Sequence, residues 1–61
     1  MQIQDIRQKI RRGDYQLIAE MTGYEPETVR MQIRGHRTLK EKVLSAAIKV
    51  IESRENLINQ N

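Results

Sequence analysis

The chain has 61 residues and a formal net charge of +3, and 38% of its residues are hydrophobic. A chain of this length forms one domain and buries only about 60% of the surface that its unfolded form exposes. Because it contains no cysteine, a disulfide framework and the common thiolate metal sites are excluded.

Three isoleucines near the N-terminus, Ile3, Ile6 and Ile10, recur at helical spacing among polar neighbours. This spacing predicts an amphipathic first helix over about residues 2–12. We expect the helix to end at Gly13, since glycine adopts the left-handed conformation that terminates helices.

A second, shorter helix is expected over about residues 15–22. Asp14 stands at its N-cap position, where a carboxylate accepts hydrogen bonds from free backbone N–H groups. The apolar face of this helix is expected to consist of Leu17, Ile18 and Met21.

The third helix is predicted over about residues 26–34, after a tight turn at Gly23, and it ends at Gly35. Pro26, the only proline of the chain, suits the first turn of a helix because it lacks the N–H that would be unpaired there. If Val29 points inward together with Ile33, the step of about 100° per residue turns the opposite face outward. That outward face consists of Glu27, Arg30, Met31 and Arg34.

The longest periodic segment predicts a fourth helix over about residues 39–58, preceded by a Thr-x-x-Glu capping box of Thr38 and Glu41. Its apolar residues form two stripes, which together are broader than one small core requires. The second stripe can pack on the first helix or form a dimer interface, and the thin core favours the dimer. That stripe consists of Val43, Ala46, Val50 and Leu57.

Positive charge is concentrated in the middle of the chain. Between Thr28 and Lys40 there are four basic residues and no acidic one. A basic helix face is usually just solvated surface. Here, however, it follows a helix and a tight turn, which is the arrangement of helix-turn-helix DNA-binding proteins.

The segment IAEMTGYEPETVRMQIRG, residues 18–35, resembles the helix-turn-helix of the phage-repressor-like family, the group of lambda repressor and Cro. In many members the second buried apolar residue of the recognition helix stands where this chain has Gln32, and here Ile33 takes that role one position later. The residues that carry the resemblance are Ala19, Gly23, Tyr24 and Val29.

The resemblance implies an all-α, four-helix, lambda repressor-like domain over residues 1–61, with residues 26–34 in the major groove of double-stranded DNA. Bases would be contacted by Glu27, Arg30, Met31 and Arg34. Phosphates would be contacted by Tyr15, Gln16, His36, Arg37, Thr38 and Lys40. Glu27 can equally well serve only to stabilise the helix dipole. Tyr15 can equally well be a core residue.

The sequence thus predicts a sequence-specific transcriptional regulator, a Cro-like phage or bacterial repressor that acts as a homodimer in the cytoplasm. No apolar run approaches the roughly 20 residues of a membrane span, and no further domain remains for a small-molecule effector. His36 is the only histidine, and we expect neither an enzyme nor a bound metal or cofactor. The alternative is a protein-interaction module, an antitoxin or adaptor, that retains the fold.

Overall fold

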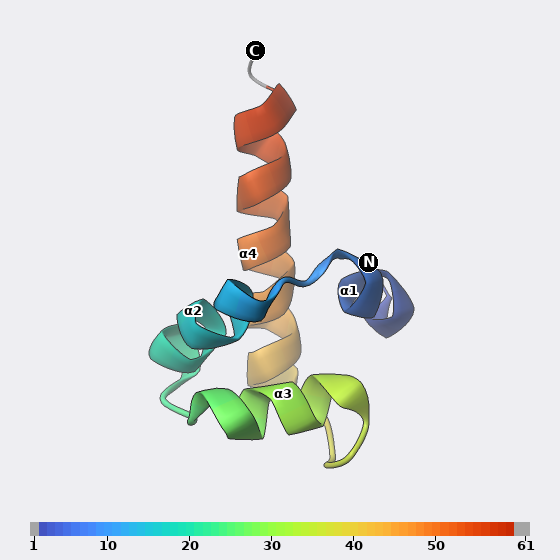
Figure 1. The fold of residues 1–61 in the computed structure, drawn as a ribbon, viewed down its shortest axis with the longest axis vertical. Coiled ribbons are helices and arrows are strands. Elements are labelled where there is room, and N and C mark those ends of the chain that lie inside the picture. Colours follow the sequence, from blue (N-terminus) through green and yellow to red (C-terminus); the bar gives the residue numbers. More distant parts are fainter. Residues whose placement is uncertain (1, 60–61) are drawn as a thin grey trace.

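The computed structural model describes residues 2–59 and the side chains of residues 2–56, and this part of the chain folds into helices joined by short turns (Figure 1). No strand occurs within residues 2–59. The predicted fold class, a small all-α domain, is confirmed. The helices are α1 (Ile3–Lys9), α2 (Arg12–Thr22), α3 (Pro26–Arg34) and α4 (Glu41–Asn59).

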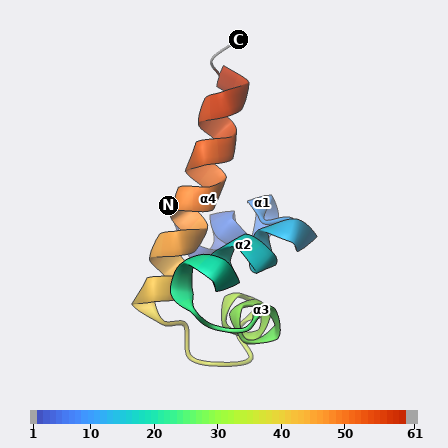
Figure 2. The ribbon, with the colours of Figure 1, turned by 90° about the vertical axis from the view of Figure 1, so that its left-hand side faces the viewer.

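The first three helices gather around the N-terminal half of α4 (Figures 1 and 2). α2 packs on both α4 and α3, and α1 packs on the same two helices. α3 lies across the end of the molecule farthest from the C-terminus, whereas the C-terminal half of α4 extends beyond the other helices in both views. The two ends of the molecule therefore offer very different surfaces, one built from α3 and one from a single projecting helix.

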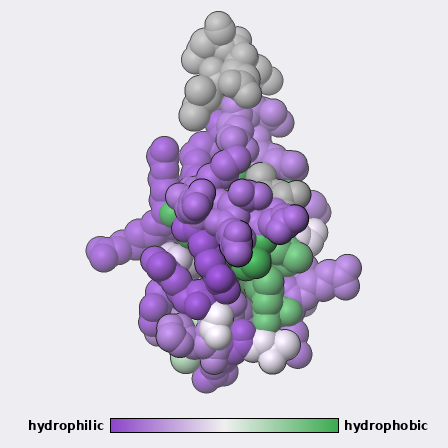
Figure 3. Space-filling model, turned by 90° about the vertical axis from the view of Figure 1, so that its right-hand side faces the viewer, coloured by the Kyte–Doolittle hydropathy of each residue, from purple (hydrophilic) through white to green (hydrophobic). Residues whose placement is uncertain are grey.

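The core is aliphatic apart from Tyr15, and every helix contributes to it. On the face that carries α1, hydrophilic residues cover most of the surface around a short hydrophobic strip (Figure 3). The buried hydrophobic residues are Ile6, Tyr15, Ile18, Ala19, Val29, Ile33, Val43, Ala46, Ala47 and Ile51.

The junction between α1 and α2 differs from the prediction. α1 ends at Lys9, Ile10 is extended, and α2 already begins at Arg12, so the predicted stop at Gly13 and the predicted N-cap at Asp14 are both wrong. Asp14 lies within the first turn of α2, and its Oδ2 accepts the Arg11 N–H at 2.9 Å.

A distant arginine explains this earlier helix start. Arg54 of α4 donates to Oδ2 of Asp14 at 2.5 Å and to the carbonyl of Lys9 at 2.6 Å. The guanidinium thereby holds the last carbonyl of α1 and the first turn of α2 together. Because these contacts join residues 40 or more positions apart, the local sequence pattern contains no sign of them.

The start of α4 also differs from the prediction. α4 begins at Glu41, and its first turn is closed by the Leu44 N–H on the Lys40 carbonyl at 3.0 Å. Lys40 is therefore the N-cap, and its own N–H is bound by the side-chain oxygen of Gln32 at 3.0 Å. Thr38 lies two residues before the N-cap, so the predicted capping box is wrong.

The ends of the middle helices agree with the prediction. Gly23 follows α2 with a φ of 84°, and Gly35 follows α3 with a φ of 91°. Pro26 opens α3. Left-handed glycines and an N-terminal proline act within a single turn, which is why the sequence alone located the turn between α2 and α3.

Replacing Gly35 with alanine is expected to lower the free energy of unfolding by about 1–2 kcal/mol, because an L-residue in the left-handed region costs about that much. The new Cβ would also lie 3.1 Å from Nη2 of Arg7. Gly13→Ala is the matched control, since this glycine lies in a helical turn and a Cβ there meets no described atom within 4 Å. It should instead stabilise the protein by about 0.4–1 kcal/mol. Urea denaturation measures the free energy of unfolding of both variants. Equal changes in the two would contradict the left-handed conformation of Gly35.

Candidate nucleic-acid interface

The inner face of α3 is set by three side chains. Val29 and Ile33 are fully buried, which confirms the expectation that both point inward, and Gln32 is only 4% exposed. Gln32 is therefore also part of the inner face. It stands at the position where many members of the resembled family have an apolar residue.

Gln32 has a structural task that explains its burial. Its side-chain oxygen accepts the N–H of Lys40, so a buried polar group finds a partner and the N-cap of α4 is fixed against α3. The loop of residues 35–39 is therefore held at both ends, since at its start the N–H groups of His36 and Arg37 both donate to the Met31 carbonyl, at 2.8 and 3.2 Å.

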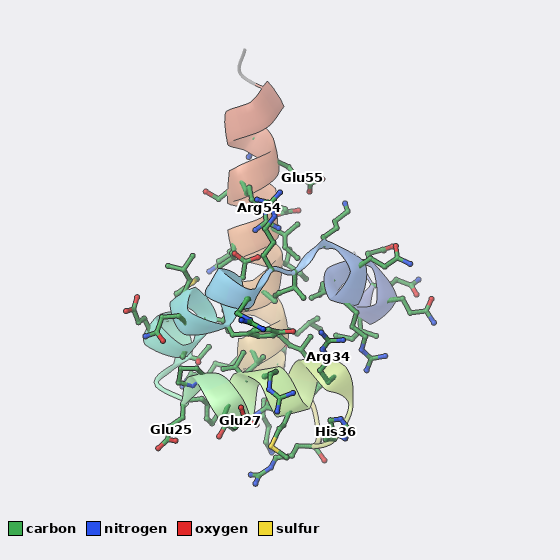
Figure 4. The ribbon with its side chains drawn as sticks, in the orientation of Figure 1. Glu25, Glu27, Arg34, His36, Arg54 and Glu55 are labelled. Carbon is green, nitrogen blue, oxygen red and sulfur yellow. The ribbon has the colours of Figure 1, made fainter. Side chains whose placement is uncertain are left out.

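The outer face of α3 carries the residues that the sequence assigned to base contact. Glu27, Arg30 and Arg34 are exposed and Met31 is half-buried. The charge along α3 is asymmetric, because Glu25 and Glu27 lie at its N-terminal end whereas Arg34 lies at the other, beside His36 (Figure 4). This distribution follows the helix dipole, and it places the positive surface at the C-terminal half of α3.

Glu27 and Arg30 form an ion pair on this outer face. Nε of Arg30 donates to one carboxylate oxygen of Glu27 at 3.1 Å, and Nη2 donates to the other. The hydrogen bond from Arg30 lowers the pKa of Glu27, and the same bond, followed by the charge of Glu27, raises the pKa of Arg30. Both groups therefore stay ionised at neutral pH, and Glu27 has a partner within its own helix.

The residues assigned to phosphate contact fall into two groups. His36, Arg37, Thr38 and Lys40 are exposed in and after the loop that follows α3, continuous with Arg34. Gln16 is exposed in α2, whereas its neighbour Tyr15 is only 8% exposed and belongs to the core. The sequence left two roles open for Tyr15, a phosphate contact and a place in the core, and the structure places its ring in the core.

A polar hollow lies where the start of α2 faces α3. Its volume is about 420 Å³, and it is lined by Ile10, Arg11, Arg12, Tyr15, Arg30 and Arg34. Arg11 and Arg12 are not among the site residues predicted from the sequence, because the predicted first helix includes both at its end. The two consecutive arginines before Gly13 and Asp14 were the available sign of a basic cluster. They line the same hollow as Arg30 and Arg34 because α2 begins at Arg12.

Two of the four residues of the predicted dimer stripe do not lie on the surface. Val43 is fully buried and Ala46 is 5% exposed, so neither can contact a second protomer, and this part of the prediction is wrong. The protomer's own helices take both residues into the core. Val50 is half-buried, and the side chain of Leu57 lies outside the described residues.

The exposed apolar surface lies instead on α2. Leu17 and Met21, which the sequence assigned to the inner face, are 48% and 51% exposed. They line a shallow groove between α2 and α4 together with Val50, Glu20, Lys49 and Ser53. The groove is thus apolar at its base and carries one acidic and one basic residue at its edge.

None of the helices within residues 2–59 is long and apolar enough to cross a membrane. Within the same described residues, no cluster of three or more histidine, cysteine, aspartate or glutamate residues is placed to hold a metal ion.

Comparison of the chain with protein-family models, with curated proteins and with solved structures gives no match. What the protein does is therefore inferred from its own surface, above all from α3, the loop after it and the start of α2.

Proposed function

We propose that the protein is a sequence-specific regulator of transcription that binds double-stranded DNA in the manner of phage-repressor-like proteins, with α3 in the major groove. One observation carries this proposal: the α2–turn–α3 unit buries Val29, Gln32 and Ile33 and leaves the opposite face of α3 exposed. That face carries arginines and continues into a basic loop. An exposed helix at one end of a small domain has the shape that fits a groove about 12 Å wide.

The two arginines of α3 are not equivalent in this role. Arg30 already uses Nε and Nη2 on Glu27, so fewer donors remain for a base. Arg34 has no carboxylate within 4.0 Å among the described side chains. A guanine takes two parallel hydrogen bonds from one guanidinium, and we therefore assign guanine recognition to Arg34. The Glu27–Arg30 pair presents an acceptor and a donor side by side, which suits a cytosine amino group next to a phosphate or base oxygen.

Titration with a duplex pool of randomised sequence tests the proposal. Binding is expected to weaken with added salt, and the logarithm of the affinity should fall against the logarithm of salt concentration by about 0.9 for each phosphate contacted. Fluorescence anisotropy measures this slope, and sequencing of the retained duplexes gives the preferred site. Absence of duplex binding at low salt, or a flat salt response, would contradict the proposal.

A homodimer is part of the proposed function, and the groove between α2 and α4 is its proposed interface. The groove carries Glu20 and Lys49 beside the apolar Leu17 and Met21, so a two-fold contact between two copies would bring opposite charges and apolar side chains into one interface. A dimer would place two copies of α3 in successive major grooves about 34 Å apart. Sedimentation equilibrium measures the association, and a monomer at every concentration with a non-palindromic site would argue against it.

The same groove supports a second candidate function, a protein-interaction module. Leu17 and Met21 are the only large hydrophobic side chains among the described residues that are prominently exposed, and another protein can cover them as well as a second copy can. This function gains support if the duplex titration fails while the protein remains folded.

A further inference from the structure

The outer face of α3 carries an ion pair of its own, between Glu27 and Arg30. The other two ion pairs among the described side chains connect α4 with α1 and with α2. Glu27 and Arg30 lie three residues apart in one helix, a spacing at which side chains meet on the helix surface. Their side chains are 63% and 44% exposed, so the pair is accessible to any molecule that α3 contacts.

The pair occupies one edge of the Arg30 guanidinium. Nε and Nη2 of Arg30 donate to the two carboxylate oxygens of Glu27, and paired N–H groups of this kind also match two oxygens of a phosphate. A phosphate can take this edge only if it displaces the carboxylate, whose negative charge repels it. Glu27 therefore competes with DNA phosphates for Arg30.

Arg30 is otherwise surrounded by positive charge. It lines one hollow with three further arginines, and it alone of the four has a carboxylate within 4.0 Å among the described side chains. A basic cluster attracts the phosphates of any duplex, whatever the base sequence. Glu27 offsets one charge of this cluster and leaves the others available. The three further arginines are Arg11, Arg12 and Arg34.

We propose that Glu27 is a specificity-determining residue that acts by exclusion, because it keeps Arg30 from DNA phosphates and so weakens binding to duplexes of unrelated sequence. The inference rests on the proposed function. At the base edges of the major groove, cytosine and adenine offer amino groups that a carboxylate accepts, whereas guanine and thymine present only acceptor atoms. A base that turns acceptors toward Glu27 is therefore repelled, and specificity arises from a penalty on the wrong sequences.

The exposure of the pair sets the size of the expected effect. An exposed ion pair changes an equilibrium constant by up to about fivefold. A freed Arg30 would contact one more phosphate, and each phosphate contacted adds about 0.9 to the slope of log affinity against log salt concentration. The salt slope therefore reports on the freed guanidinium more directly than the affinity does.

Glu27→Gln is expected to bind a duplex of unrelated sequence about two- to fivefold more tightly than the parent protein does. Its salt slope should be steeper by about 0.9, because Arg30 then reaches a phosphate. The affinity for the preferred duplex should rise less, so the ratio of the two affinities falls. Fluorescence anisotropy at several salt concentrations measures both affinities and both slopes.

Glu25→Gln is the matched control. Glu25 and Glu27 both lie at the N-terminal end of α3 (Figure 4) and both are exposed. The two substitutions remove the same charge, but of the two glutamates only Glu27 has an ion-pair partner among the described side chains. Glu25→Gln should therefore leave the salt slope unchanged. The double variant Glu27→Gln, Arg30→Gln should have the slope of Arg30→Gln alone, because the steeper slope requires the freed guanidinium.

The outcomes separate this inference from the proposed function. If the parent protein binds duplex with the expected salt response, but Glu27→Gln and Glu25→Gln change the slope equally or not at all, the inference fails and the proposed function stands. A steeper slope that persists in the double variant also overturns the inference, since Arg30 is then not the residue released. If neither the parent nor any variant binds a duplex at low salt, both fail.

Discussion

Replacing Arg54 with alanine is expected to lower the free energy of unfolding by about 2–4 kcal/mol. The substitution removes the partner of a carboxylate that is only 8% exposed, and breaking a buried pair from one side typically costs about 3–5 kcal/mol. Because Arg54 itself is 23% exposed, solvent offsets part of that loss. A chain of this size has about 3–9 kcal/mol of total stability, so the loss is a large fraction of the whole.

Lys9→Ala is the control for this prediction. It removes the Lys9–Glu55 pair, which joins α1 to α4 at 3.1 Å and is 45% and 43% exposed. An exposed pair contributes about 0–1 kcal/mol. Chemical denaturation measures both variants, and a loss in Arg54→Ala no larger than that in Lys9→Ala would refute the role of the buried pair.

Replacing Arg34 with alanine is expected to weaken binding to the preferred duplex by about 1–3 kcal/mol and to relax the preference at one base pair, if Arg34 contacts a guanine as proposed. The side chain is exposed at the C-terminal end of α3, so the fold should remain unchanged. Anisotropy titration with the preferred duplex and with single-base variants measures both effects.

Lys9→Ala is the charge-matched control, since Lys9 pairs with Glu55 of α4 and lies on neither the face of α3 nor the groove between α2 and α4. It removes the same unit of charge but should leave the base preference intact. If Arg34→Ala changes affinity only as much as Lys9→Ala, and selects the same sequences, then Arg34 contributes general electrostatic attraction and does not recognise a base.

The sequence was most informative where a structural signal is contained within one turn of the chain. Gly23, Pro26 and Gly35 located the turn before α3 and both of its ends, because each acts through its own backbone conformation. The inward orientation of Val29 and Ile33 followed from the helical period alone. The element that carries the proposed function was therefore the best predicted part of the molecule.

The starts of α2 and α4 were not predictable in this way. The first depends on Arg54, and the second on the side chain of Gln32. Each partner lies in another helix, and the local capping residues Asp14 and Thr38 offered plausible but incorrect alternatives. The helix boundary then concealed the hollow as well, since its arginines belong together only when α2 begins at Arg12.

The amphipathic patterns also did not show which apolar residues lie on the surface. Helical period shows that a stripe is apolar but does not show which neighbour covers it. Val43 and Ala46 are covered by the protomer's own core, whereas Leu17 and Met21 are left outside. The choice depends on how α2 and α4 are rotated against each other, and this rotation is a property of the whole fold.

The position of Arg54 has a consequence for synthesis of the chain on the ribosome. The guanidinium that joins the end of α1 to the start of α2 is made 40 residues after Asp14. During translation the N-terminal half therefore emerges without the contact that fixes its own corner, and contacts between distant residues form late because the chain between them must first be closed. The corner between α1 and α2 therefore acquires its hydrogen bonds to Arg54 only after that part of α4 has been synthesised.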